Sequence, residues 1–511
     1  MTSNTSRKIQ NPKSKIQNPE DSSRVTLIDT HCHLDMFDQE ADAVVQRAKD
    51  AGIEAIITVG SDPGSNESNL AIARKHDIVY AAVGVHPHDA KDFTPDIFER
   101  LRAWSKDSNE LQATGDAPKI QNPKSKIQNL ENLSRTTRQA SRSKVVAVGE
   151  TGLDYHYDHS PREVQKDVFR KHLAIAEAAG LPVIVHSREA KADTLDILRE
   201  SETARGVLHC FSGDMDMAER VMEMGLYISI AGPVTFRNAG RLQEIVRSIP
   251  DDYLLVETDA PYLAPVPLRG RRNEPSCIIH TAKRLAELRG VSPEDIARIT
   301  TVNARRLFRT AELPDYGEIA YRIRDSLYLN VTNRCTNKCS FCVRFHKDFV
   351  KGHKLRLAHE PSEDELKGAI GDPSRYREIV FCGYGEPLLR LNTVKNIARW
   401  IKNGGGSVRI NTNGHGNLIH KRNILPELRG IVDSLSVSLD AHDRETYDRI
   451  CGPSFENAFR EVVTFIEDAK GYIPDVQATV VEMDGVDIEK CRELAGSLGV
   501  PLRVRKLNVV G

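Results

Sequence analysis

Short apolar runs alternate with helical patterns along residues 24–310 of the chain. The runs are rich in Val, Ile and Leu without strict polar alternation, which is typical of parallel strands buried on both faces. The predicted strands are VTLID, AIITVG, VYAAVGVHP, VVAVGET, PVIVHS, GVLHCFS, LYISIAG and LLVETDAP. Eight strands separated by helical segments predict an α/β fold, with a (β/α)₈ TIM barrel over residues 24–310.

A second series of strand and helix patterns begins at about Ser326. Its predicted strands are SLYLNVT, EIVFCGYG, SVRINTN, SLSVSLD, VQATVVE and LRVRKLN. Six strands suit a partial (β/α)₆ barrel better than a closed barrel. We therefore predict a second domain over residues 325–511, and a linker without a clear period over residues 311–324.

The start of one helix is well marked near the end of the first series. Ser292 is a suitable N-cap, Pro293 fits the first helical position, and Asp295 can complete a capping box. The sequence therefore predicts a helix that begins directly after Ser292.

A polar repeat stands apart from both series. KIQNPKSKIQNPE at residues 8–20 recurs as KIQNPKSKIQNLE at residues 119–131. Such segments cannot bury enough apolar surface to offset the entropy lost on ordering. We predict a disordered N-terminus over residues 1–23 and a surface-loop insertion over about 106–144. The alternative function for the repeat is a basic tether for nucleic acid.

Composition adds limits to this architecture. With 40% hydrophobic residues among 511, the chain can bury more than one core. Its net charge of −1 argues for no polyanionic partner, although a local basic patch could still bind one. We find neither an apolar run of about 18 residues nor an N-terminal secretory signal. We expect a soluble, cytoplasmic protein without a membrane partner. Its nine cysteines are then expected to be thiols rather than disulfides.

Almost every predicted strand of the first series ends in a residue type that binds metals. These residues are His31, His33, Glu150, His186, His209 and Asp259. The carboxyl ends of parallel barrel strands converge on one rim, and strand alternation places His31 and His33 on the same side. Imidazole and carboxylate donors suit Zn²⁺, Mn²⁺ or Mg²⁺. A single histidine at a strand end is more often a core residue, but six donor residues together favour a metal site.

This mixture of donors suits two-metal hydrolysis. Two divalent ions about 3.5–4 Å apart can share a hydroxide and neutralise charge on a phosphorane-like transition state. Glu150 could bridge both ions. Asp259 could bind one ion and also transfer a proton of the nucleophilic water, so these two residues are the predicted catalytic carboxylates.

Seven motifs occur in order across nearly all of residues 24–310: IDTHCHLD, GVHPHDA, VGETGLDYHYD, PVIVHSREA, HCFSGD, ETDAPYLAP and RGRRNEP. They resemble TatD-type metal-dependent deoxyribonucleases. The resemblance implies one ion held by His31, His33, Glu150 and Asp259, and another held by Glu150, His186 and His209. It also implies 3′–5′ exonuclease-like hydrolysis of DNA or another nucleic acid. The residues that resemble substrate-side or outer positions are His86, Asp154, Arg188, Ser212 and Glu257.

Three cysteines crowd into a loop after the first strand of the second series. Cys335, Cys339 and Cys342 have the spacing C-x₃-C-x₂-C. Three thiolates can ligate three irons of a [4Fe–4S] cluster and leave the fourth iron open for S-adenosylmethionine. The alternative is a Cys₃His zinc site that includes His346.

FCGYGEP, RINTNG and SVSLDA follow at successive predicted strand ends. With the cysteine spacing, they resemble the radical S-adenosylmethionine (radical SAM) superfamily, close to its small members associated with TatD nucleases. The resemblance implies cofactor contacts from Gly383, Gly385, Glu386, Asn411 and Ser438. It also implies an external electron donor for the cluster. Tyr384 occupies a position that the superfamily usually gives to glycine, which could alter the local backbone.

The predicted protein is therefore bifunctional, with a two-metal phosphodiesterase joined to a radical SAM enzyme of unknown substrate. One alternative gives the first barrel another ester or amide substrate, such as D-aminoacyl-tRNA. Another makes that barrel mainly a binding module for the radical SAM domain. A basic segment with interleaved phenylalanines, VRFHKDFVKGHKLRL, could bind phosphate or be a solvated loop.

Overall fold

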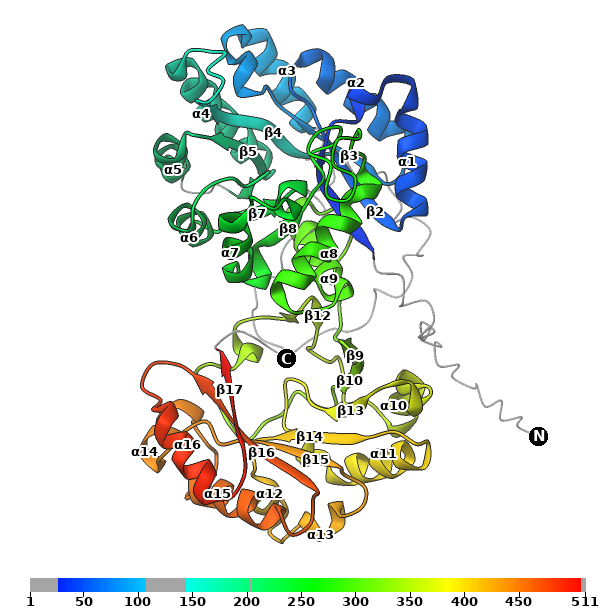
Figure 1. The fold of residues 1–511 in the computed structure, drawn as a ribbon, viewed down its shortest axis with the longest axis vertical. Helices are drawn as coiled ribbons and strands as arrows, with labels where there is room; N and C mark the ends of the chain where they lie inside the picture. The colour runs from blue at the N-terminus through cyan, green and yellow to red at the C-terminus, as the bar shows by residue number, and fades with distance from the viewer. Residues whose placement is uncertain (1–25, 107–143, 202–204, 507–511) are drawn as a thin grey trace, which may run out of the picture.

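The computed structural model describes residues 26–106, 144–201 and 205–506 as two successive α/β units (Figure 1). The first unit runs from blue to green in Figure 1, and the second runs from olive to red. The predicted N-terminal segment 1–23 and residues 107–143 of the predicted insertion lie outside the described residues. Among the described residues, no helix has the length and apolarity needed to cross a membrane.

The first unit is a barrel of eight parallel strands in sequence order, as predicted. The strands are β1 (Leu27–Cys32), β2 (Ile53–Val59), β3 (Val79–Val83), β4 (Val145–Asp154), β5 (Val183–Arg188), β6 (Gly206–Leu208), β7 (Tyr227–Ile230) and β8 (Leu254–Val256). A parallel bridge between Cys32 and Ala260 joins the first and last strands. Several predicted strands ran too far, because the apolar pattern continues into the loops that follow β3, β6 and β8.

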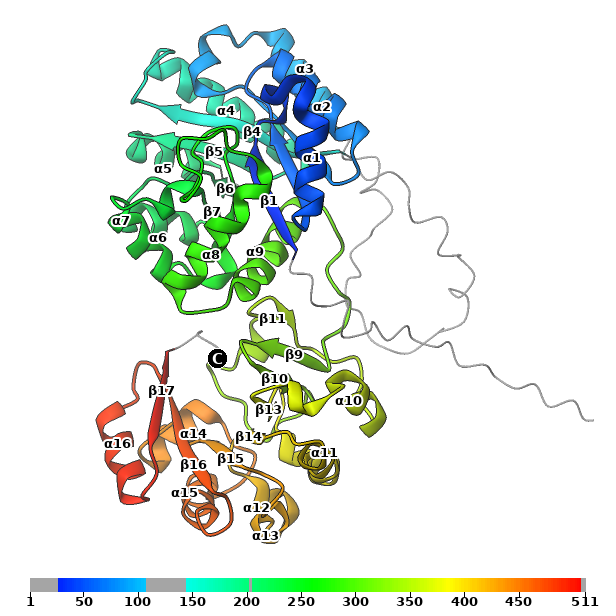
Figure 2. The ribbon, with the colours of Figure 1, turned by 45° about the vertical axis from the view of Figure 1, so that its right-hand side comes forward.

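Helices cover the outside of this barrel (Figures 1 and 2). They are α1 (Ala41–Asp50), α2 (Pro63–Lys75), α3 (Pro95–Lys106), α4 (Arg162–Ala179), α5 (Lys191–Glu200), α6 (Met215–Glu223), α7 (Gly240–Ser248) and α8 (Ile278–Arg289), and α9 (Pro293–Phe308) follows them. The last helix closes the amino-terminal end of the barrel, since its Leu307 and Phe308 are buried in one cluster with the strand residues Ile28, Ile184 and Leu255. The carboxyl ends of the strands, with the residues that follow them, are therefore supported by an apolar base.

The second unit is an open seven-stranded sheet in the order β17-β16-β15-β14-β13-β10-β9. Its strands are β9 (Ala320–Ile323), β10 (Ser326–Leu329), β13 (Glu378–Phe381), β14 (Val408–Thr412), β15 (Ser434–Ser438), β16 (Asp475–Glu482) and β17 (Leu502–Lys506), and β11 (Phe349–Val350) pairs with β12 (His353–Lys354) in a hairpin. The six predicted strands are confirmed, and they are parallel.

The additional edge strand β9 lies inside the predicted linker 311–324 and pairs antiparallel with β10. Tyr321 and Ile323 are buried there, whereas Arg322 is exposed. Four residues with this alternation are too few to be recognised as a strand from the sequence alone. The helices of this unit are α10 (Glu363–Ile370), α11 (Leu391–Asn403), α12 (Gly416–His420), α13 (Leu425–Leu428), α14 (Arg444–Cys451), α15 (Ala458–Ala469) and α16 (Ile488–Ser497).

The second unit contacts the amino-terminal end of the first barrel (Figure 2). Asp252, just before β8, forms an ion pair with Lys347. On α9, Arg298 Nε donates a hydrogen bond to the carbonyl oxygen of Lys351 at 2.8 Å. The basic segment after the cysteines therefore packs against the base of the first barrel.

The capping box predicted for α9 is present, because Ser292 Oγ accepts from the amide of Asp295 (3.1 Å) and Asp295 Oδ2 accepts from the amide of Ser292 (3.2 Å). We expect the Ser292→Ala substitution to lower the free energy of unfolding by about 1 kcal/mol, since an amide of the first turn loses its acceptor. Urea unfolding followed by circular dichroism measures this change. Ser292→Thr keeps the hydroxyl and is the control. Equal midpoints for the alanine variant and the native protein would contradict the stabilising role of the cap.

Candidate metal centre and cysteine site

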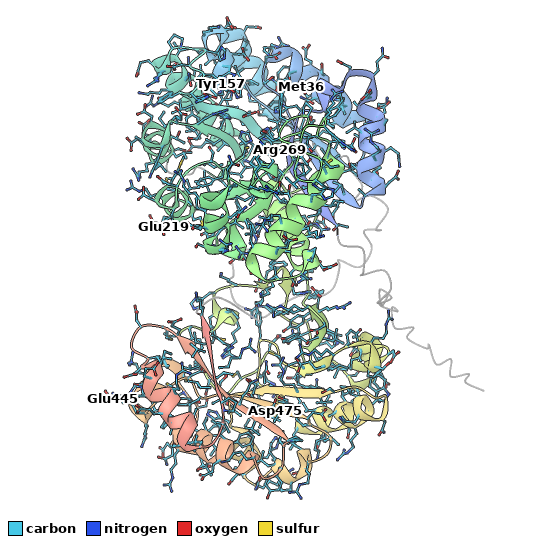
Figure 3. All side chains as sticks on the ribbon, viewed as in Figure 1. Met36, Tyr157, Glu219, Arg269, Glu445 and Asp475 are labelled. Atoms are coloured by element: carbon cyan, nitrogen blue, oxygen red, sulfur yellow. The ribbon has the colours of Figure 1, made fainter. Side chains whose placement is uncertain are left out.

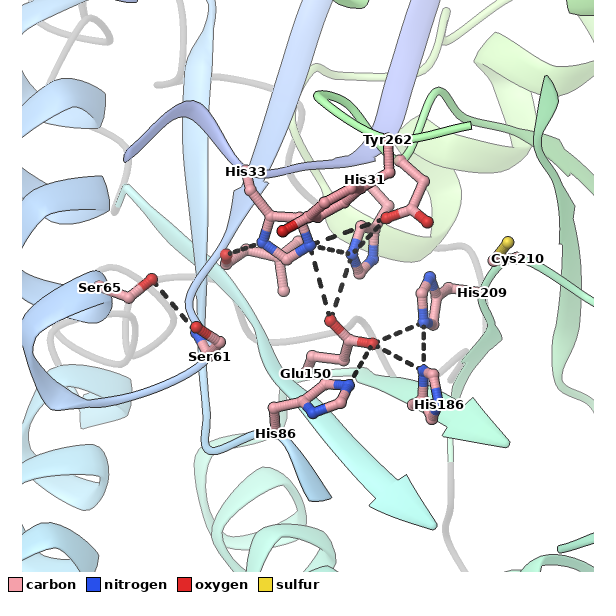
Figure 4. Close-up of polar contacts among 12 residues, drawn as sticks. His31, His33, Ser61, Ser65, His86, Glu150, His186, His209, Cys210 and Tyr262 are labelled. Carbon is pink, nitrogen blue, oxygen red and sulfur yellow. Dashed lines mark hydrogen bonds and ion pairs between the residues drawn. The ribbon is translucent and has the colours of Figure 1, made fainter. Parts of the chain in front are cut away.

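The six residues predicted as metal ligands come together at the carboxyl end of the first barrel, and Figure 4 labels all of them except Asp259. His31 and Glu150 lie within β1 and β4, and His186 lies within β5. His209 directly follows β6, whereas His33 and Asp259 lie in loops after β1 and β8. Their side chains all point to one place, as the convergence of parallel strands requires.

The carboxylate of Glu150 lies at the middle of this group, between two sets of histidines (Figure 4). Its Oε2 is 3.4 Å from His31 Nε2 and 3.8 Å from His33 Nε2. Its Oε1 is 2.7 Å from His209 Nε2 and 3.0 Å from His186 Nδ1. The two carboxylate oxygens therefore face different sets of imidazole nitrogens, which suits a carboxylate shared by two cations.

Asp259 completes the side of the centre that holds the first histidine pair. Its Oδ1 lies 3.7 Å from the Nε2 atoms of both His31 and His33. Among the described residues, every group of three or more His, Cys, Asp or Glu donors within 4.8 Å of one another belongs to this centre. Imidazole nitrogens and carboxylate oxygens suit borderline or hard divalent cations, so the residues fit the implied metals.

Two histidines of the GVHPHDA motif lie at or beside the centre. His86 Nε2 is 3.5 Å from Glu150 Oε1, so a residue predicted to face the substrate lies within the donor group. The sequence analysis missed His88, whose Nε2 lies 3.2 Å from Asp154 Oδ2. His86 and His88 are two residues apart, as His31 and His33 are. This repeated spacing could have identified His88 from the sequence.

Two of the imidazoles are oriented by hydrogen bonds at the nitrogen that faces away from the donor group. His33 Nδ1 lies 2.9 Å from the carbonyl oxygen of Val59, and His186 Nε2 lies 3.1 Å from Asp154 Oδ2. Such contacts fix the tautomer and the ring orientation of a metal-binding histidine. Asp154 itself is buried at the end of β4. Its predicted position outside the ligand set agrees with this geometry.

Charges within the centre compensate one another. Burial alone would raise the pKa of Glu150, but His209, His86 and His31 together lower that pKa well below its usual value. Burial alone would lower the pKa of His209, yet Glu150 and Glu257 raise it well above the usual value. Glu150 is only 3% exposed, so an ionised carboxylate at this position requires positive charge beside it.

A glycine lets β4 and β5 approach each other beside these residues. Gly152 has φ of 134°, and a Cβ atom at this position would collide with the carbonyl oxygen of His186. Only glycine adopts this backbone conformation readily. The local sequence therefore allows Glu150 and His186 to lie close enough for contact.

The predicted cysteine site lies in the loop that follows β10. Cys335, Cys339 and Cys342 are all partly buried. The amide of Asn337 donates to Cys335 Sγ at 3.4 Å, and Asn413 Nδ2 donates to the same sulfur at 3.7 Å. Burial raises the pKa of Cys335 to about 12, so this sulfur becomes a thiolate only beside a strong positive charge such as a metal centre.

The geometry does not favour the alternative zinc site. The side chain of His346 is exposed, and its Nε2 contacts the carbonyl oxygen of Ser340 at 3.1 Å. A tetrahedral zinc ion would hold its sulfur ligands about 3.8 Å apart. Within the described residues, the three thiols do not form a donor group within 4.8 Å. A [4Fe–4S] cluster binds each thiolate at a different iron, so three cysteines would suffice to hold it without His346.

A fourth cysteine lies beside this loop. A hydrogen bond with Cys339 is the main cause of the raised pKa of Cys451, and burial raises that pKa further. The backbone of the loop is also tied to α14, because the amides of Lys338 and Ser340 donate to the carbonyl oxygens of Cys451 and Ile450, both at 2.9 Å. The sequence analysis did not foresee this contact, because Cys451 lies more than one hundred residues after the three cysteines of the loop.

The glycine-rich element after β13 packs against the start of the cysteine loop. A Cβ atom on Gly385 would collide with the carbonyl oxygens of Thr332 and Arg334, and the amide of Glu386 donates to the latter oxygen at 2.7 Å. Gly383 has φ of 149°. Both glycines are therefore needed for the element to reach the loop.

The carboxylate of Glu386 is occupied by protein donors. It accepts hydrogen bonds from Thr412 Oγ1 (2.8 Å), from the amide of Asn413 (2.7 Å) and from the amide of Leu388 (3.0 Å). Burial raises its pKa to about 7. These contacts tie the end of β13 to the end of β14, so Glu386 positions the strand ends.

The two other residues predicted to contact the cofactor lie at neighbouring strand ends. Asn411 lies in β14, where its Oδ1 accepts from Arg409 Nη1 at 2.9 Å. Ser438 is the last residue of β15 and is partly exposed. Both therefore lie on the same edge of the sheet as the glycine-rich element.

Comparisons with known proteins match both units. The TatD-related DNase family matches residues 28–309, and the Radical SAM superfamily matches residues 329–498. The uncharacterized metal-dependent hydrolase YabD of Bacillus subtilis is 42% identical over 287 residues, which are 55% of this chain and 99% of that protein. The protein named 3′-5′ ssDNA/RNA exonuclease TatD of Pectobacterium parmentieri is 33% identical over 283 residues, which are 54% of this chain and 95% of that protein.

Among solved structures, the TatD homologue YJJV of Escherichia coli has 29% identity and a TM-score of 0.46, with 56% of this chain and 98% of that chain covered. The family matches rest on sequence, and they coincide with the two units of the fold. The chain therefore belongs to the TatD-related DNase family of metal-dependent hydrolases, with a radical SAM domain joined to its carboxyl side.

Proposed function

We propose that the first unit hydrolyses phosphodiester bonds at the 3′ end of a nucleic-acid strand, using two divalent metal ions. The observation that carries this proposal is the position of Glu150, whose two oxygens face separate histidine pairs. The name of the Pectobacterium relative, a 3′-5′ ssDNA/RNA exonuclease, supports the substrate class. An ester or amide such as D-aminoacyl-tRNA is the competing substrate.

The proposed ligands divide into two sets that share Glu150. One set is His31, His33, Glu150 and Asp259, and the other is Glu150, His186 and His209. When bound, two ions of Mg²⁺, Mn²⁺ or Zn²⁺ would acidify a water molecule and neutralise negative charge on the phosphoryl group. The contacts of Asp259 with the histidines involve Oδ1, which leaves Oδ2 to accept the proton of the attacking water.

Hydrolysis is tested with the full chain on single-stranded DNA and RNA labelled at the 5′ end, in the presence of each cation. We expect a product ladder that shortens from the 3′ end, and a loss of at least 100-fold in kcat for Glu150→Gln, because both metal sites lose a shared charged ligand. Glu99→Gln on the exposed face of α3 is the matched control. A native protein that cleaves aminoacyl esters but neither DNA nor RNA would overturn the phosphodiesterase proposal.

Metal affinity tests the contacts that orient the histidines. We expect Asp154→Asn to weaken binding at the His186 site by about 10- to 100-fold, since the amide cannot hold the imidazole as the carboxylate does. Isothermal titration calorimetry of the Asp154→Asn variant with Mn²⁺ should resolve one site with native affinity and one site with weakened affinity. Asp196→Asn on the surface of α5 is the control. If both sites weaken equally, or neither does, the division of ligands is wrong.

We further propose that Cys335, Cys339 and Cys342 hold a [4Fe–4S] cluster whose fourth iron is open to S-adenosylmethionine. When bound, cluster and cofactor supply reductive cleavage of S-adenosylmethionine, with the electron coming from an external donor. Gly383 and Gly385 bring backbone groups to the cofactor. The other proposed contacts at this edge of the sheet are Asn411 and Ser438, with Glu386 positioning the strand ends around them.

Anaerobic reconstitution with iron and sulfide tests the cluster. We expect the native protein to show visible iron–sulfur absorption and to release 5′-deoxyadenosine after reduction with dithionite in the presence of S-adenosylmethionine. Cys335→Ala should lose both signals. Cys491→Ala, at a buried cysteine of α16, should keep them. A colourless protein that binds one zinc ion through the three cysteines would refute the proposal.

The first barrel is then an enzyme rather than only a binding module for the radical SAM domain. Its proposed metal centre is at the carboxyl ends of the strands, whereas the second unit contacts the opposite end through Asp252 and α9. This separation supports hydrolysis that does not depend on the radical reaction.

A further inference from the structure

Two large aromatic side chains are exposed beside the candidate metal centre. Tyr157 is 53% exposed and Tyr262 is 52% exposed. The loop that carries Tyr262 also exposes Leu263 and Val266. A single exposed apolar side chain is common on protein surfaces, but several around one polar site mark a place where a ligand binds.

Each tyrosine is held at a fixed position relative to a carboxylate of the centre. Tyr157 is three residues after Asp154, and its amide donates to Asp154 Oδ1 at 2.9 Å. Tyr262 is three residues after Asp259, and its amide donates to the carbonyl oxygen of Asp259, also at 2.9 Å. The two carboxylates belong to opposite sides of the donor group, so the tyrosines flank it.

The ring of Tyr262 adjoins the first histidine pair. Its centroid is 6.3 Å from that of His33, and its hydroxyl donates to Met36 Sδ at 3.3 Å. Figure 4 shows this ring lying over the histidines, on the side of the centre away from His186. The Tyr262 ring therefore borders the first of the two proposed metal sites.

The ring of Tyr157 lies on the other side of the centre. The guanidinium of Arg188 lies 4.8 Å from its centroid, and the imidazole of His88 meets it edge-on at 5.4 Å. Figure 3 shows Tyr157 and Met36 on the part of the first unit that is remote from the second unit. A cation beside an exposed aromatic ring can bind a phosphate group next to a stacked base.

From this arrangement we propose that Tyr157 and Tyr262 are nucleobase-stacking residues that bind the nucleosides on the two sides of the scissile phosphodiester. An exposed ring presents a face that any base can stack upon, so recognition would be independent of sequence. Bases within a duplex are already stacked and paired. The substrate is therefore a single strand or a frayed end. This inference rests on the proposed phosphodiesterase function and specifies its substrate.

Binding is measured without hydrolysis, using the full chain freed of divalent ions by EDTA. The probes are a dT10 strand labelled at the 5′ end and a strand of the same length in which every nucleoside is abasic. Fluorescence anisotropy gives the Kd for each. We expect the native protein to bind dT10 at least tenfold more tightly than the abasic strand, since stacking on an aromatic side chain contributes about tenfold or more per base.

The tyrosine variants decide whether these residues cause the preference. Tyr157→Ala and Tyr262→Ala should each raise the Kd for dT10 about tenfold and leave the Kd for the abasic strand unchanged. Tyr157→Phe and Tyr262→Phe keep the ring and should bind as the native protein does. Tyr316→Ala, at a tyrosine that is 67% exposed in the segment between the units, is the matched control.

Three results would overturn the inference: equal affinities of the native protein for the two strands, alanine variants that bind dT10 normally, or a loss for alanine that extends equally to the abasic strand. The last result would indicate a structural role or contacts with the backbone alone. Absence of phosphodiester hydrolysis in the metal-loaded native protein is a separate outcome. It would refute the proposed function, whereas the binding measurements would still decide whether the two tyrosines stack on bases.

Discussion

The first unit depends on one buried carboxylate. Glu150 lies within β4, almost fully removed from water, with its two oxygens directed at different histidine pairs. Removing an ion from water costs several kcal/mol even after the protein relaxes, so this charge is stable only where opposite charge surrounds it. The barrel meets this requirement by ending several strands in imidazoles at the same rim. An apolar base, closed by α9, then supplies the stability that the polar rim does not.

Much of this centre could be predicted from the sequence because parallel barrel strands follow simple geometry. His31 and His33 are two residues apart, so alternation alone places them on one side, and their Nε2 atoms lie 3.3 Å apart. Glu150 and His209 were predicted because each follows or ends an apolar run. The positions of their side chains relative to one another depend on the closure of the barrel. No local pattern gives the distances.

The features that sequence reasoning missed have a different physical origin. His88, after β3, contacts Asp154 at the end of the neighbouring strand β4, and this contact exists only after β3 and β4 are paired. Tyr157 belongs to no periodic sequence pattern, because its exposure depends on the path of the loop that follows β4. Strand β9 is too short to establish an alternating pattern, and its pairing with β10 defines it as a strand. Tertiary placement, rather than residue type, determines each of these features.

Tyr384 shows how the two units are connected. It stands where the radical SAM superfamily usually has glycine, and its hydroxyl donates to the carbonyl oxygen of Lys347. The side chain of Lys347 in turn pairs with Asp252 at the base of the hydrolase barrel. The glycine-rich element is thus in contact with the very segment that docks on the first unit. The base of that barrel is closed by α9, whose Leu307 and Phe308 are buried against strand residues. The described contacts between the units lie at this base, where residues 343–354 meet Asp252 and α9 and Arg324 Nη2 donates to the carbonyl oxygen of Gly290 at 2.8 Å.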